Sequence, residues 1–87
     1  MRVRVRLVSL LRDAVGGRSL VEVELPGSEA SFEDVLKALY EQYPSLARLV
    51  EKLRERGLEI LVVSEKGREG GVKEGDTVVL LPPASGG

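Results

Sequence analysis

The feature that most constrains the fold is a strict alternation of charged and apolar residues near the start of the chain. Residues 2–8 read RVRVRLV, so on an extended backbone the arginines lie on one side and the apolar residues on the other. A period of two is typical of a strand with one buried face. Residues 19–25, SLVEVEL, repeat the pattern with glutamates, after a short helical segment that stops at Gly16–Gly17. The pattern predicts two strands that form a hairpin-like pair.

The charged side of this pair carries opposite charges on its two strands. Arg2, Arg4 and Arg6 are expected to face Glu22 and Glu24 across the pair. We interpret this side as a solvated outer face of a sheet, in preference to a specific docking site.

The middle of the chain predicts two helices. Ser31 is a favourable N-cap, and an apolar stripe spaced by three and four residues follows it. Pro44 interrupts the pattern. A second helix is expected after it, capped by Ser45 and ended by Gly57. Both stripes are interpreted as core.

Two later segments, residues 58–63 and 77–81, predict strands that are apolar on both faces, and the polar residues between them predict turns with one short strand. The order of elements indicates an α+β domain, a mixed sheet with helices packed on one face and the last strand parallel to the first. Such a sheet normally has a polar outer side. Either the second helix covers that side or a partner does, and Val79 and Leu81 are candidates for a partner interface.

The composition excludes several kinds of function. The chain has 87 residues, which indicates one domain, and it has no Cys and no His. This excludes a thiol nucleophile, a Ser-His-Asp triad and a zinc site with Cys or His ligands, and no other metal site is indicated. The net charge is −1, and the aromatic residues all fall on the first helix, so we expect no nucleic-acid partner. No segment resembles a signal peptide or a membrane span, so we expect a cytoplasmic protein without a membrane partner.

The last residues, LLPPASGG, form a stiff spacer followed by two glycines. Pro82 and Pro83 favour an extended backbone, and residues 82–87 reach at most roughly 20 Å at about 3.3–3.6 Å per residue. Gly86 and Gly87 lack a Cβ and fit a narrow channel. The carboxylate of Gly87 is anionic at neutral pH, because an α-carboxyl has a pKa of about 3.3–3.7. We expect a folded domain over residues 1–81 and an extended tail over residues 82–87, with Ser85 in the part that enters a partner.

These segments together resemble one family. The opening strand VRVRLVSLLRDAVG, the capped helix SFEDVLKALYEQYP and the terminal EGDTVVLLPPASGG resemble the ubiquitin-like β-grasp sulfur carriers, and in particular the small subunit of molybdopterin synthase. The resemblance implies a ubiquitin-like β-grasp fold. It also implies a non-catalytic carrier that holds no cofactor of its own.

The resemblance further implies a sequence of partners. An adenylating enzyme similar to the ubiquitin-activating enzymes uses ATP to activate the carboxylate of Gly87. A sulfur donor then converts it to a thiocarboxylate. The large catalytic subunit of molybdopterin synthase receives the tail, and the sulfur enters molybdopterin, the precursor of the molybdenum or tungsten cofactor.

Three alternatives stay open. The chain is a ubiquitin-like modifier that joins Gly87 to lysines of other proteins, a sulfur carrier of the thiamin pathway, or an interaction module with an inert tail. The thiamin carriers are shorter and lack the proline pair, so that alternative ranks below the molybdopterin role.

Overall fold

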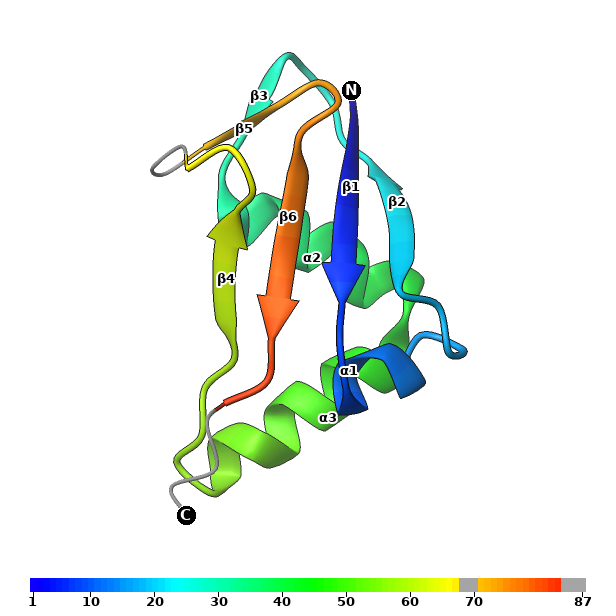
Figure 1. Ribbon diagram of the computed structural model, residues 1–87, viewed down its shortest axis with the longest axis vertical. Coiled ribbons are helices and arrows are strands. Elements are labelled where there is room, and N and C mark those ends of the chain that lie inside the picture. Colours follow the sequence, from blue (N-terminus) through cyan, green and yellow to red (C-terminus); the bar gives the residue numbers. More distant parts are fainter. Residues whose placement is uncertain (68–70, 84–87) are drawn as a thin grey trace.

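The computed structural model of the chain describes residues 1–67 and 71–83 (Figure 1). Four strands form one sheet in the order β2-β1-β6-β4, and two short strands, β3 and β5, pair separately. Along the chain the elements are β1 (Arg2–Leu7), α1 (Leu10–Asp13), β2 (Leu20–Glu24), β3 (Glu29–Ala30), α2 (Phe32–Gln42), α3 (Pro44–Glu55), β4 (Leu61–Ser64), β5 (Val72–Lys73) and β6 (Thr77–Leu81).

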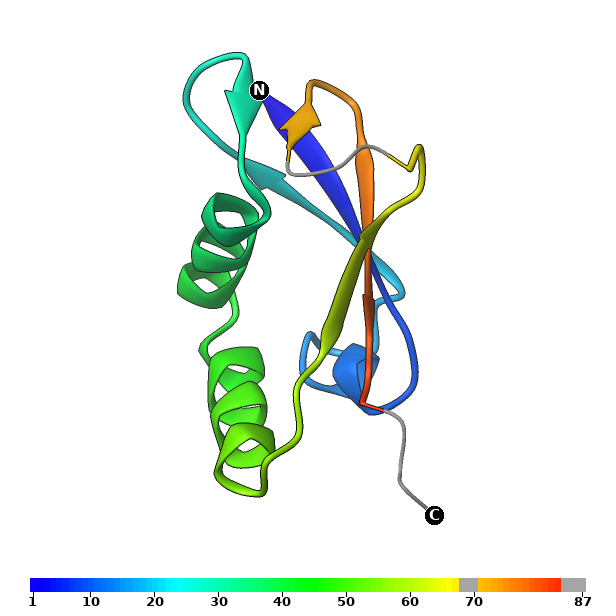
Figure 2. The same ribbon diagram turned by 90° about the vertical axis from the view of Figure 1, so that its left-hand side faces the viewer.

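The sheet is mixed, as the sequence predicts. Val5 in β1 lies opposite Val21 in the antiparallel β2 and opposite Val78 in the parallel β6. β4 completes the sheet antiparallel to β6, with Leu61 opposite Leu81. The last strand therefore returns beside the first. Helices α2 and α3 lie on one face of this sheet (Figure 2).

The core lies between the sheet and these two helices. Val3, Val5 and Leu7 are 0% exposed, which confirms that the alternation in β1 has one buried side. The helical stripes contribute in the same way, which confirms their assignment to the core. The buried hydrophobic residues of the described chain are Val3, Val5, Leu7, Leu11, Val15, Val21, Val23, Leu25, Val35, Leu39, Leu46, Val50, Val72, Val78 and Leu80.

Helix α2 begins with a complete capping box. The Ser31 hydroxyl accepts a hydrogen bond from the Asp34 backbone N–H at 3.1 Å, and the Asp34 carboxylate accepts one from the Ser31 backbone N–H at 3.1 Å. Both donors would otherwise lack a partner at a helix start. The sequence-based prediction of Ser31 as N-cap is confirmed.

Helix α3 begins differently from the prediction. Its N-cap is Tyr43, with Pro44 in the first turn, and Ser45 is inside the helix. Proline suits the first helical position because its fixed φ is already helical and no N–H is needed there. The Ser45 hydroxyl instead accepts a hydrogen bond from Arg48 Nη2 at 3.2 Å. The prediction of Ser45 as a cap is wrong, since the helix starts at Pro44, two residues earlier than a Ser45 cap implies.

The end of α3 sets where the next strand begins. Gly57, with φ +78°, donates to the Arg54 carbonyl at 2.8 Å, and Leu58 donates to the Leu53 carbonyl at 2.9 Å. This is a Schellman motif, which confirms Gly57 as the stop. Because Leu58 is used in closing the helix, the strand predicted over residues 58–63 begins only at Leu61.

The short strands β3 and β5 form a second small sheet, in which β3 was not predicted and β5 was. The turn after β5 is held by Asp76, which is 1% exposed. Its carboxylate accepts a hydrogen bond from the Lys73 backbone N–H at 2.9 Å and lies 3.6 Å from Lys66 Nζ. Asp76 is thus the turn residue that the sequence indicates, and it fixes the start of β6.

No helix of the described residues could span a membrane. Within the two described ranges, each helix is too short or too polar to cross a bilayer.

Replacing Ser31 by Ala should destabilise the domain by about 1 kcal/mol, because the capping box is lost. For a domain of this size, that corresponds to a fall of about 4–8 °C in the melting temperature. Ser45→Ala is the matched control and should change the free energy of unfolding by less than about 0.5 kcal/mol. Thermal denaturation followed by circular dichroism measures both. Equal losses in the two variants would contradict the cap assignment.

The capping box should also make stability depend on pH. The pKa of Asp34 is lowered, chiefly by the hydrogen bond from the Ser31 backbone and then by the Ser31 side chain. A carboxylate with a lowered folded-state pKa contributes stability above its unfolded pKa, and this is lost as the pH falls through the folded pKa. The advantage of the wild type over Asp34→Asn should therefore be constant above about pH 4 and shrink below it. Urea denaturation between about pH 2 and pH 6 tests this, and a pH-independent difference would contradict it.

Candidate functional site

The base of the tail lies at the end of β6, one of the two central strands. Pro82 and Pro83 follow Leu81, are partly buried and adopt no regular secondary structure. Proline has no N–H for the sheet ladder, which explains why β6 ends there. This base lies at the end of the molecule opposite the N-terminus (Figure 1). Ser85, Gly86 and Gly87, to which the sequence analysis gives roles in the tail, lie outside the described residues.

An apolar surface lies on the sheet face that the helices leave open. It consists of Leu61 and Val63 from β4 and Val79 and Leu81 from β6, and is called the outer apolar patch below. Leu61 pairs with Leu81 and Val63 pairs with Val79 across the two strands. Leu61 is 55% exposed and Val63 is 36% exposed. The patch is continuous with the base of the tail, because Leu81 precedes Pro82.

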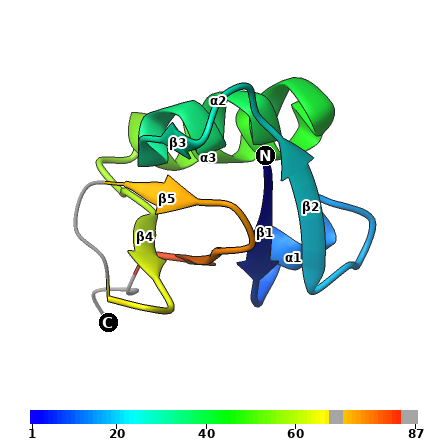
Figure 3. The ribbon, with the colours of Figure 1, turned by 90° about the horizontal axis from the view of Figure 1, so that it is seen from above.

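The patch decides between the two explanations for the doubly apolar strands. Seen along the strands, α2 and α3 lie on the other side of the sheet (Figure 3). The second helix therefore does not cover this face. Exposed apolar side chains in a continuous group are typical of a surface that binds another protein. Register adds Leu61 and Val63 to the predicted pair Val79 and Leu81, because alternation alone did not tell which β4 residues point outward.

Charged residues border the patch on β1 and beyond β4. Arg6 lies opposite Val79, and its Nε is 3.0 Å from Glu65 Oε2. Arg2 Nε lies 3.2 Å from Glu24 Oε1, which confirms a predicted cross-strand pair. Arg6 was expected to face a glutamate of β2, but its cross-strand neighbour there is a leucine, so it pairs with Glu65 instead. Exposed pairs of this kind contribute only about 0–1 kcal/mol, so they shape the surface more than they stabilise the fold.

The connection from β1 to α1 reaches the same end of the sheet. Parallel pairing places Leu7 opposite Leu80, so the residues after Leu7 follow beside the tail base. Ser9 has φ +56°, a conformation that favours glycine, and Leu10 is 40% exposed. The sequence predicts neither the positive φ of Ser9 nor the exposure of Leu10, because a serine before a short helix is typical of an ordinary cap. Its side chain makes no capping hydrogen bond.

The clearest shifts in pKa lie elsewhere. The pKa of Tyr40 is raised, mainly because burial disfavours the charged phenolate, and that of Asp34 is lowered by the capping box. Both residues are on α2, on the other side of the sheet. In the parts of the chain that the structure covers, no group of three or more acidic side chains is placed to hold a metal ion. The described surface beside the tail base is therefore mainly apolar, with the Arg6–Glu65 ion pair at its border.

Solved structures share this architecture over nearly the whole chain. SAMP1 from Haloferax volcanii has a TM-score of 0.71 and 25% sequence identity, with 100% of each chain covered. The small archaeal modifier protein 1 from Methanosarcina acetivorans has a TM-score of 0.69 and 30% identity, with 99% of this chain and 96% of that chain covered. CysO in the BexX/CysO complex from Amycolatopsis orientalis has a TM-score of 0.67 and 25% identity, with 98% and 99% covered.

These likenesses confirm the expected ubiquitin-like β-grasp fold, with its mixed sheet and its helices on one face. No family model matches the chain, and no curated protein sequence matches it.

The outer apolar patch should contribute little to the stability of the isolated domain. Replacing Leu61 and Val63 together by Thr should change the free energy of unfolding by less than about 1 kcal/mol, because both side chains are partly exposed and Thr favours strands. Leu80→Ala, in the same sheet but 0% exposed, should cost about 2–5 kcal/mol. Denaturant unfolding measures both. A loss in the double variant as large as that of Leu80→Ala would show that the patch stabilises the fold.

Proposed function

Because the chain belongs to the ubiquitin-like β-grasp family of small sulfur carriers and protein modifiers, we propose that it carries sulfur on the carboxyl group of Gly87. In this proposal it is the small subunit of molybdopterin synthase, and it delivers that sulfur to a pterin precursor held by the large catalytic subunit. The chain itself performs no catalysis. ATP is a substrate of the activating partner.

The chemistry needs only a free carboxylate from this chain. A carboxylate oxygen of Gly87 attacks the α-phosphorus of ATP, and pyrophosphate leaves to give an acyl adenylate. A hydrosulfide equivalent from the sulfur donor then attacks the acyl carbon, and AMP leaves to give a thiocarboxylate. The carboxylate is already anionic at neutral pH, so no base from the carrier is required. The partner supplies the cationic groups that stabilise the charge on the transferring phosphoryl group.

The observation that carries this proposal is the position of the tail base. β6 leads directly from the centre of the sheet into Pro82 and Pro83, and the outer apolar patch begins at Leu81, the preceding residue. A partner that covers the patch is therefore beside the point where the tail leaves the domain. The proline pair favours an extended path away from the domain over a return to it. These features suit a domain that binds by its sheet and inserts its end.

Covering the patch also suits a reversible subunit contact. The exposed parts of Leu61 and Val63 become buried only when a partner is present, and burial contributes roughly 25 cal/mol per Å² before the costs of association. Arg6 and Glu65 lie at the border of the patch, where charges select the partner and its orientation.

A second candidate function is protein modification. It is favoured by the two similar structures from archaea, of which one is described as a small archaeal modifier protein. In this case a lysine amine of another protein attacks the activated acyl carbon of Gly87, and an isopeptide bond replaces the acyl adenylate. Both candidates need the same activation step, so one chain can serve both.

Mass spectrometry of the protein from its native host tests the carrier proposal. The intact chain should contain a form that is heavier by one exchange of oxygen for sulfur, located at Gly87. Deleting Gly87, or adding one Ala after it, should abolish this form and molybdopterin synthesis in cells that lack the wild-type gene. Both variants should melt within the error of the wild type, because changes at an exposed chain end affect stability little.

The same samples separate the modifier from the carrier. The last site for trypsin is Lys73, so a conjugate should leave residues 74–87 branched on a lysine of the target. Finding that branch without any thiocarboxylate would favour modification alone. Full synthesis of molybdopterin by the Gly87 deletion would contradict the carrier proposal.

A further inference from the structure

A row of basic side chains runs along α3 and does not take part in the site described above. Arg48, Lys52 and Arg56 are spaced by four residues, and all three are exposed. This spacing places side chains on one face of a helix. They are called the basic row below. Glu51 and Glu55 form a parallel acidic row at the same spacing.

Charges within each row repel, whereas Arg48–Glu51 and Lys52–Glu55, three residues apart, are favourable pairs between the rows. Like charges four residues apart destabilise a helix, and opposite charges stabilise it. The neighbouring helix α2 follows the stabilising pattern, with Glu33, Lys37 and Glu41 alternating at this spacing. In α3 the helix dipole favours Lys52 in the last turn and Arg56 at the C-cap, but Arg48 lies too early in the helix to benefit.

The positive charges of the row are not used for ion pairs in the described part of the chain. Arg54, which lies off the row, pairs with Glu59 at 3.4 Å. Arg48 donates only to the uncharged Ser45 hydroxyl, at 3.2 Å. Over residues 1–67 and 71–83, neither Lys52 nor Arg56 forms an ion pair. The row is thus a set of exposed positive charges, with Glu51 and Glu55 beside it, on a chain whose net charge is −1.

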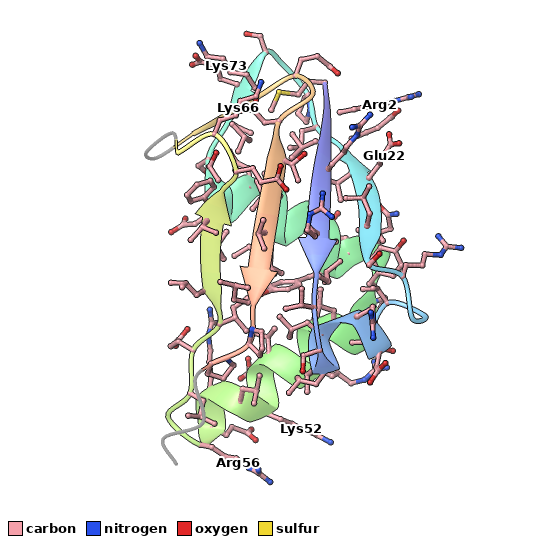
Figure 4. All side chains as sticks on the ribbon, in the orientation of Figure 1. Arg2, Glu22, Lys52, Arg56, Lys66 and Lys73 are labelled. Atoms are coloured by element: carbon pink, nitrogen blue, oxygen red, sulfur yellow. The ribbon has the colours of Figure 1, made fainter. Side chains whose placement is uncertain are left out.

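The basic row lies at the end of the molecule where the tail leaves. Lys52 and Arg56 extend from the end of α3 at the same end of the domain as the last described residues of the chain (Figure 4). Lys66 and Lys73 lie at the opposite end and are paired, with Asp76 and Glu29 respectively. Residues 82–87 span at most roughly 20 Å, so an enzyme that holds Gly87 must approach this end.

We propose that the basic row docks on an acidic surface of the adenylating enzyme, beside the opening that admits the tail. This inference rests on the proposed function. Because the net charge of the chain is close to zero, attraction of the whole molecule is weak, and the row acts locally to orient the approach. Complementary charges at the edge of an interface raise the association rate more than the final affinity. The outer apolar patch then provides the buried contact, on a different face.

Charge reversal tests this with the adenylating enzyme from the same host. ATP–pyrophosphate exchange is measured with the wild-type carrier and with Lys52→Glu/Arg56→Glu, at varied carrier concentration and salt. At about 0.05 M salt the variant should lower kcat/KM about tenfold or more through KM, with kcat at saturation unchanged. The difference should disappear near 1 M salt, where charges are screened within about 3 Å. Lys37→Glu/Lys73→Glu makes the same change of net charge on other elements and should behave almost as the wild type.

Every other outcome of the charge-reversal experiment leads to a single conclusion. Equal KM values and equal salt dependence for the two double variants, with normal exchange by the wild type, would overturn the basic row and leave the carrier intact. No exchange with the wild type would overturn the proposed function, and this inference with it. If Lys52→Glu/Arg56→Glu leaves KM unchanged but abolishes binding of a fluorescent RNA oligonucleotide, the row binds nucleic acid and the inference is wrong. Melting temperatures within a few degrees confirm that both variants are folded.

Discussion

The parallel ladder between β1 and β6 is the contact on which the rest of the structure depends. It joins the first and last strands of the chain and places Val5 beside Val78 in the centre of the core. A parallel pair needs a crossover between its strands, and here the crossover contains α2 and α3, the two helices that cover the sheet. The ladder also positions the tail base and the outer apolar patch, because it fixes where β6 ends and which of its residues face away from the helices. Loss of this pairing would therefore remove the core and the tail base together.

The parts of the fold that sequence analysis predicted are those that depend on a local period. The alternation in β1 and β2 and the apolar stripe of α2 each indicate which side of the element is buried. The tertiary structure buries those same sides. The errors occurred where two local rules compete. Ser45 is a good cap by its side chain, but Pro44 has a helical φ already and starts the helix first. The strand predicted over residues 58–63 loses its first residues to the Schellman motif at Gly57. The two-residue strand β3 has no period of its own and forms only because β5 lies beside it.

The candidate site, like the fold, could be predicted from the sequence only in part. The doubly apolar strands indicated that the outer face is covered either by the second helix or by a partner. The sequence did not tell which of the two applies or which β4 residues face outward. That required the register of β4 on β6, which places Leu61 and Val63 outward and turns Val62 toward the helices. Ser9 could not be predicted at all, since its unusual φ is set by the path from β1 into α1. The proposed role of Gly87 rests on a resemblance of sequence segments, and the structure describes only the strand β6 and the two prolines that precede the tail.

Pro82 affects how far the tail can reach from the sheet. Without an N–H it cannot extend the ladder between β1 and β6, so Pro82 and Pro83 are not part of the sheet. Another strand end could pair one residue further with its neighbour. Pro82 prevents this at the end of β6. Each residue between Leu81 and Gly87 therefore adds about 3.3–3.6 Å of possible reach. In the proposed function, the number of residues in that interval limits how far from the sheet the activating enzyme can act on Gly87.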